Sequence, residues 1–74
     1  MDRPTLEAAI KTCLREISTR LEQATSIGKV AEACADAGNV DKGVEVALDI
    51  EQLAYEASRL LDAASLLNRI TRAD

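Results

Sequence analysis

The feature that most constrains the fold is where helix-interrupting residues stand. The only proline is Pro4, and the clearest turn signal is Gly38-Asn39, near the midpoint of the 74 residues. Gly38 can take the left-handed backbone conformation that ends a helix, and Asn39 can cap the next helix, with Asp41 facing the positive end of its dipole. Pro4 suits a helix start, for which Asp2 is the better cap. Because helix formers fill both halves, we expect an all-α, long antiparallel two-helix hairpin.

We expect these two helices to make up one domain that includes the whole chain. Each helix would be about 50 Å long at 1.5 Å per residue. The expected ranges are a single helical hairpin domain over residues 1–74, a first helix over about 4–37, a turn at 38–39 and a second helix over about 40–72.

A competing interpretation places a break near Ser26-Gly28, which would make three helices. The polar residues of the first helix argue against it, because spacings of three and four keep them on one helical face straight through Gly28. These residues are Glu7, Lys11, Arg15, Ser18, Glu22, Thr25, Lys29, Glu32 and Asp36. We therefore favour one continuous helix, bent near Gly28.

The opposite face of the first helix is apolar and is expected to face the second helix. Up to residue 24, the apolar residues of this face are Leu6, Ile10, Cys13, Leu14, Ile17, Leu21 and Ala24. Toward the turn this face continues with the small residues Gly28, Ala31 and Ala35. The turn end of the first helix should therefore approach its neighbour closely, on a rotated face.

The second helix has a heptad pattern, which is typical of packing along one helical seam. One row is Val46, Leu53, Leu60 and Leu67, and its companion row is Ile50, Ala57 and Ala64. We interpret these rows as the core of the hairpin. An acidic row on the same helix, expected to face solvent, is Asp41, Glu45, Asp49, Gln52 and Glu56.

The C-terminal half of the second helix is apolar around nearly its whole circumference. One hairpin partner cannot cover such a helix, and a chain of this size is marginally stable alone. We therefore expect a homodimer in which two hairpins form a four-helix bundle, since two-fold dimers are the commonest assembly; docking on a different helical protein is the alternative. The expected interface residues are Leu53, Leu60, Ala63, Leu66, Leu67 and Ile70.

The composition argues against chemistry. The chain has no His and one aromatic residue, Tyr55, and it has no glycine-rich phosphate loop. We expect no enzyme activity, no cofactor and no metal site. Cys13 and Cys34 would lie about 30 Å apart on one helix, too far for a disulfide within the chain. For each cysteine two interpretations remain open: a small buried thiol, or a disulfide between the two chains of a dimer.

These observations favour a non-enzymatic protein–protein interaction module, such as a small adaptor, regulator or chaperone-like helical protein. One alternative is an RNA-binding hairpin dimer that uses Lys11, Arg15, Arg69 and Arg72, although the net charge of −4 argues against nucleic acid. Another alternative is one subunit of a heteromeric helical complex. No signal peptide or membrane-spanning run is evident, so the expected location is cytoplasmic.

Overall fold

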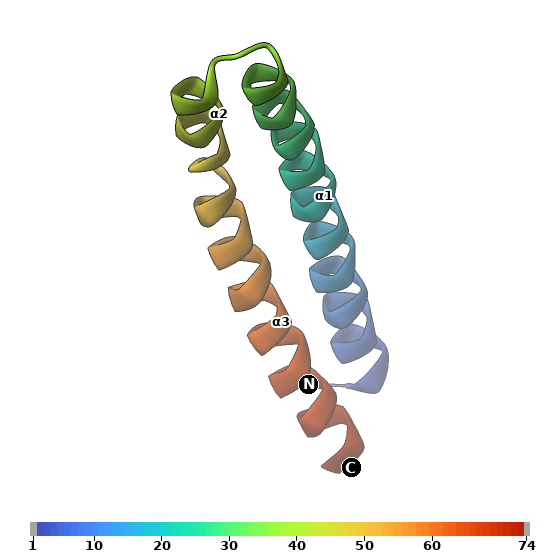
Figure 1. The fold of residues 1–74 in the computed structure, drawn as a ribbon. Helices are drawn as coiled ribbons and strands as arrows, with labels where there is room; N and C mark the ends of the chain where they lie inside the picture. The colour runs from blue at the N-terminus through green and yellow to red at the C-terminus, as the bar shows by residue number, and fades with distance from the viewer. Residues whose placement is uncertain (1, 74) are drawn as a thin grey trace.

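The computed structural model describes residues 2–73 and shows an all-α hairpin. Its helices are α1 (Arg3–Asp36), α2 (Val40–Ala47) and α3 (Ile50–Ala73). α2 and α3 follow one another along one arm, which packs antiparallel against α1, so that both ends of the chain lie opposite the turn (Figure 1). The molecule measures 56 × 14 × 12 Å. The predicted two-arm antiparallel architecture is confirmed.

The first helix starts where the capping and proline positions predicted. Asp2 is the N-cap residue, with an extended backbone, and its carbonyl oxygen accepts a hydrogen bond of 3.1 Å from the Leu6 N–H. Its carboxylate accepts a hydrogen bond of 2.5 Å from the Thr5 hydroxyl. Pro4 lies in the first turn, where its missing N–H breaks no helical hydrogen bond.

The turn between the arms closes α1 with a glycine in the left-handed conformation. Gly38 has φ of 91°, and its N–H donates to the Ala35 carbonyl at 3.0 Å. The next N–H, that of Asn39, donates to the Cys34 carbonyl at 2.9 Å, which completes a Schellman motif. The Asn39 side chain then accepts from the Lys42 N–H at 3.2 Å and caps α2. Both roles predicted for Gly38 and Asn39 are confirmed.

α1 runs without interruption through Gly28, so the alternative with a break near Ser26-Gly28 is wrong. Every residue of the predicted polar face, from Glu7 to Asp36, is exposed. The phase of the polar residues was therefore a sounder indicator than the local Thr25-Ser26-Ile27-Gly28 sequence.

The second arm is helical over residues 40–73, close to the predicted 40–72, and one tightened turn at Leu48 and Asp49 divides it into α2 and α3. The Asp49 N–H donates to the Val46 carbonyl at 3.2 Å, and the Glu51 N–H to the Leu48 carbonyl at 3.1 Å. Both bonds span three residues instead of four, which tightens one turn of the arm. The tighter turn interrupts the α-helix while keeping Ile50 on the side that faces α1.

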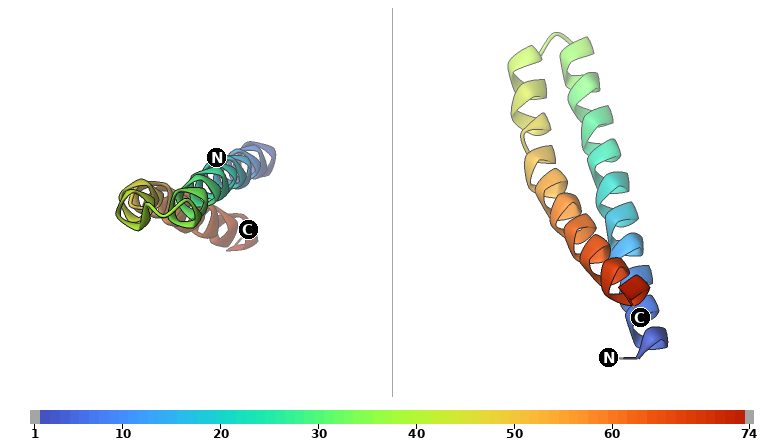
Figure 2. Two further views of the ribbon diagram at one scale, coloured as in Figure 1. Left: turned by 45° about the horizontal axis from the view of Figure 1, so that its top comes forward. Right: turned by 90° about the horizontal axis from the view of Figure 1, so that it is seen from below.

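The two arms meet along one continuous seam, and they cross at a shallow angle (Figure 2). In both arms the seam residues alternate spacings of three and four, the pattern of a coiled coil, and all of them are buried or half-buried. The seam residues of α1 are Leu6, Ile10, Cys13, Ile17, Arg20, Ala24, Ile27, Ala31 and Cys34. Those of α2 and α3 are Gly43, Val46, Ile50, Leu53, Ala57, Leu60, Ala64, Leu67 and Thr71.

The arms approach each other closely near the turn, as the small residues predicted. A Cβ atom built on Gly43 would lie 2.7 Å from the Ala31 carbonyl oxygen and 3.4 Å from the Ala35 nitrogen. The two backbones thus nearly touch there, and only glycine fits at position 43 without a shift of α2 or α1. Gly28 and Ala35 are half-buried beside the seam, which is the predicted rotation of the buried face.

Candidate interaction surface

The hairpin buries little of its apolar content. Among the described residues, the buried apolar ones are Leu6, Ala31 and Ala64. Ten large apolar side chains are instead between 45% and 61% exposed. They are Leu14, Leu21, Val30, Val40, Val44, Leu48, Tyr55, Leu61, Leu66 and Ile70. Extended apolar surface of this kind marks places where other molecules pack.

The seam divides the exposed residues into two flanks. A residue one position after a seam residue is rotated by about 100° to one side, and a residue one position before it to the other. Because the arms are antiparallel, the residues that follow the seam in both arms share one flank. A shallow groove confirms this, since it is lined by Leu14 of α1 together with Ser65 and Asn68 of α3, which all follow seam residues.

We call the first side the leucine flank, defined by the residues that directly follow a seam residue. Its large apolar members are Leu14, Leu21, Val44 and Leu61, each more than half exposed. The expectation that Leu14 and Leu21 face the second arm is wrong, because the seam follows Cys13, Ile17 and Arg20 and leaves both leucines rotated outward. Their side chains line a second groove along α1 with Ser18 and Thr25.

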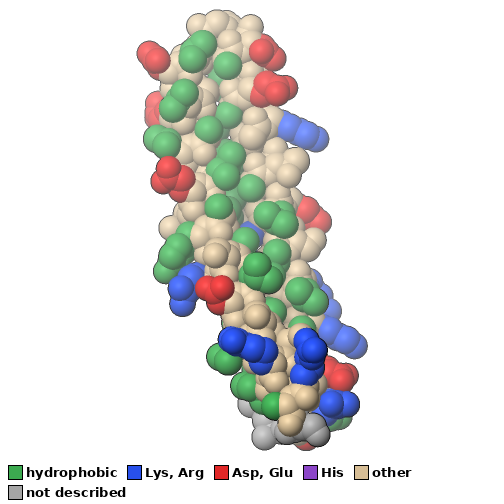
Figure 3. Space-filling view, turned by 60° about the horizontal axis from the view of Figure 1, so that its bottom comes forward, with side chains coloured by type: hydrophobic (Ala, Val, Ile, Leu, Met, Phe, Trp, Pro, Cys, Tyr) green, Lys and Arg blue, Asp and Glu red, His purple; other side chains and the backbone are tan. Residues whose placement is uncertain are grey.

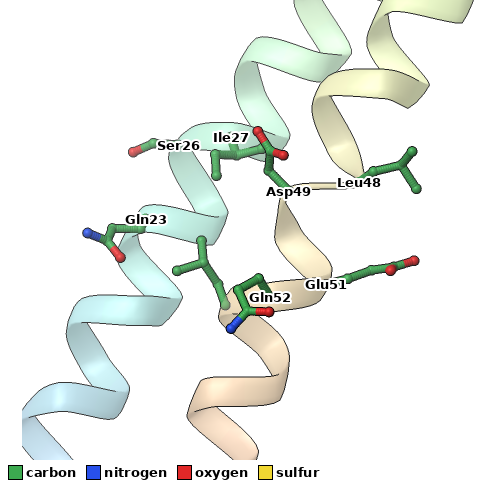
Figure 4. A pocket seen from close by; sticks show the side chains of 8 residues that line it. Gln23, Ser26, Ile27, Leu48, Asp49, Glu51 and Gln52 are labelled. Atoms are coloured by element: carbon green, nitrogen blue, oxygen red, sulfur yellow. The ribbon is translucent and has the colours of Figure 1, made fainter.

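The opposite side, which we call the second flank, is defined by the residues that directly precede a seam residue, and it includes Val30, Leu66 and Ile70. Figure 4 shows a groove on this flank between α1 and the junction of α2 and α3. Gln23, Ser26, Asp49 and Gln52 contribute to its lining, whereas the Leu48 side chain points away from α1. The groove is open, and because Ile27 and Leu53 also line it, the larger part of its lining surface is apolar.

Arg20 occupies a seam position that an apolar residue would ordinarily fill. Its guanidinium donates to Glu16 at 2.7 Å and to Glu56 of the other arm at 3.2 Å. The hydrogen bond with Glu16 raises the pKa of Arg20, and the charge of Glu56 acts in the same direction. Glu56 was expected to face solvent in the acidic row, but it is half-buried and also accepts from the Gln52 amide at 2.9 Å. A single polar site in a coiled-coil seam fixes the alignment of the two helices.

The predicted interface residues divide between the seam and the surface. Leu53, Leu60 and Leu67 are half-buried in the seam against α1. Ala63 is exposed, and Leu66 and Ile70 are 51% and 45% exposed. We call these three exposed residues the C-terminal patch. The exposed part of the predicted interface is therefore confined to the last turns of α3.

The four residues of the nucleic-acid interpretation lie toward the end of the hairpin that carries both termini. Lys11 and Arg15 of α1 and Arg69 and Arg72 of α3 are all exposed. In Figure 3 Lys and Arg side chains gather toward this end, and Asp and Glu side chains are more frequent toward the turn. Nearby, the Arg3 guanidinium donates to the Thr71 carbonyl at 3.2 Å and joins the two arms.

Other kinds of site find little support in the described part of the chain. Residues 2–73 contain no group of three or more acidic or cysteine side chains placed to hold a metal ion. Cys13 and Cys34 are free and half-buried in the seam. Within the same residues, no helix is both long enough and apolar enough to cross a membrane.

Comparison with protein-family models finds no match, and neither the curated proteins nor the solved structures give one. The argument about function therefore rests on the surfaces of this hairpin. Sequence reasoning located the C-terminal patch but missed the leucine flank. A signal was present for Leu61, which directly follows Leu60 of the heptad row, but the sequence did not separate Leu14 and Leu21 from the seam residues of α1.

Proposed function

We propose that this chain is a non-enzymatic interaction protein that works through helix packing, with two hairpins associating into a four-helix bundle. The observation that carries the proposal is the low burial of apolar residues: within residues 2–73 ten large ones are exposed, and Leu6 is the one large side chain that the hairpin buries fully. Covering these residues in an assembly gives the free energy that a two-helix core of this size does not supply.

The test is the solution mass, measured by light scattering after size exclusion over a series of concentrations. We expect a particle of twice the chain mass of 7.9 kDa. Its melting temperature should rise with concentration, because association stabilises the folded chain by mass action. A monomer at every concentration that melts at a constant temperature and binds no apolar dye would contradict the proposal.

Nucleic-acid binding is the second candidate, favoured by the exposed basic residues at the terminal end. Binding of a short RNA at low salt, with affinity that falls steeply as salt rises, would support it. Substitution of Lys11 and Arg15 should then reduce both the affinity and the salt slope. If no RNA is retained at low salt, this candidate fails and the interaction protein stands.

A further inference from the structure

The central part of the leucine flank carries no formal charge. It extends from Leu14 to Gly28 on α1 and from Ala54 to Asn68 on α3, about 20 Å along each arm at 1.5 Å per residue. Its members are Leu14, Ser18, Leu21, Thr25, Gly28, Ala54, Ser58, Leu61, Ser65 and Asn68. Glu22 borders this zone, since it lines the same groove as Leu14 and Leu21. The small side chains beside the leucines let another helix approach closely.

The charges that border this uncharged zone differ in sign at its two ends. Toward the termini the first charged residue on the flank is Lys11, and farther out the charges of Glu7 and Arg72 offset each other. Toward the turn the charged residues are Glu32 and Glu51. Lys11 and Glu32 are both exposed, and neither forms an ion pair within residues 2–73.

The whole molecule has the same asymmetry. Residues 22–55, the half that contains the turn, hold seven Asp or Glu and two Lys or Arg. The other described residues hold five Asp or Glu and seven Lys or Arg. Two copies aligned in the same direction would place like charges together, whereas two copies in opposite directions would place each acidic half beside a basic half.

The spacing along α1 makes this complementarity symmetric about Leu21. Lys11 is about 15 Å from Leu21 along the helix axis, and Glu32 is about 16 Å away in the other direction. A two-fold axis that passes through the flank near Leu21 therefore places Lys11 of each copy beside Glu32 of the other. The same axis brings the uncharged stretches of α1 together. On α3, where Glu56 lies level with Arg20, it places Leu61 of one copy near Glu51 of the other.

We infer that the leucine flank is the contact face between two copies of this chain, which lie antiparallel, with Lys11 and Glu32 paired across the interface at both ends. The inference rests on the proposed function and adds the face, the partner and the orientation. The C-terminal patch is a poorer candidate for this contact, because Ala63, Leu66 and Ile70 lie at one end of α3 and leave the middle of the hairpin uncovered.

The orientation is tested by a distance between spin labels. Cys13→Ala and Cys34→Ala remove the native thiols, and Asp36→Cys places one label at the exposed end of α1. Antiparallel copies put the two labels about 45 Å apart at 1.5 Å per residue, whereas parallel copies put them about 20 Å apart, two helix diameters. A dimer with the short distance overturns the inference and leaves the proposed function standing.

The charge pairing is tested by reversal and rescue. Lys11→Glu should weaken the dimer about tenfold, because two favourable surface pairs become two repulsive ones. The double variant Lys11→Glu with Glu32→Lys should restore the wild-type affinity. Lys29→Glu, the same charge change on the exposed side of α1 away from the flank, is the matched control and should alter the affinity less. A double variant no tighter than Lys11→Glu overturns the pairing.

The face itself is tested by two double variants of similar character. Leu21→Glu with Leu61→Glu should abolish the dimer at concentrations where the wild type is dimeric. Leu66→Asp with Ile70→Asp, on the C-terminal patch, should leave the dimer mass unchanged. The opposite result would assign the contact to the patch and overturn the inference. A folded wild-type monomer would also overturn the inference. If that monomer binds an apolar dye, its exposed surface would still support an interaction protein, so the two failures can be told apart.

Discussion

Replacing Gly43 by alanine tests the close backbone contact between α2 and α1. Alanine is the better helix former, so in an open helical position the change stabilises by about 0.5–1 kcal/mol. At Gly43, however, the new Cβ would lie 2.7 Å from the Ala31 carbonyl oxygen, which belongs to the backbone and cannot rotate away. Moving two packed helices apart costs about 1–3 kcal/mol. The cost exceeds the gain, and we expect a net loss of about 1 kcal/mol.

Gly28→Ala is the matched control within one hairpin, and because Gly28 lies on the leucine flank, both variants are compared at a chain concentration where the protein is monomeric. It places the same substitution inside α1, where nothing lies within 4 Å of the new Cβ atom. We expect Gly28→Ala to stabilise the protein by about 0.5–1 kcal/mol. The two variants should therefore shift stability in opposite directions, although the chemical change is identical.

The assay is thermal unfolding followed by far-UV circular dichroism. For a domain of this size a change of about 1 kcal/mol shifts Tm by about 4–8 °C. Gly43→Ala should lower Tm by about this amount and Gly28→Ala should raise it. Chain concentration and solution mass must match among the proteins, because association adds to the apparent stability. If Gly43→Ala raises Tm as much as Gly28→Ala does, α1 and α2 do not approach this closely and the reasoning fails.

Two further substitutions probe the terminal end. Leu6→Ala removes a side chain that is 2% exposed and should lower the free energy of unfolding in urea by about 2–5 kcal/mol. Its control is Leu48→Ala between α2 and α3, where the side chain is 56% exposed and the change should be about 0.5 kcal/mol or less. The hydrogen bond from Thr5 lowers the pKa of Asp2 below its ordinary value of 3.8, so Asp2 stabilises the fold at higher pH and loses this effect as pH falls through the folded pKa. Asp2→Asn should therefore lower Tm at neutral pH and leave it nearly unchanged at strongly acidic pH, and an equal loss at both would refute the role of the charge.

Local signals were reliable wherever a structural feature depends on neighbours in the chain. The roles of Gly38 and Asn39 followed from backbone conformation and side-chain reach, and α1 remained continuous because its polar residues keep one phase through Gly28. The interruption at Leu48 and Asp49 had no such signal. No proline or glycine stands there, and the tightened turn appears only in the hydrogen bonds of the folded arm.

The sequence by itself determined the helical class, the position of the turn and the heptad rows, since these depend on helix propensity and on the periodicity of apolar residues. It did not determine which side of each row would face the other arm. By sequence, Leu14 and Leu21 belong to the apolar face of the first helix as much as Ile10 and Ile17 do. In the structure both leucines are exposed, and the charged Arg20 occupies a seam position instead. Tertiary structure decided this, because the rotation of α1 is set by the close contact at Gly43 and by the pairing of Arg20 with Glu56. Both contacts join residues far apart in the chain, and their combined geometry leaves one flank uncharged over the middle of the hairpin.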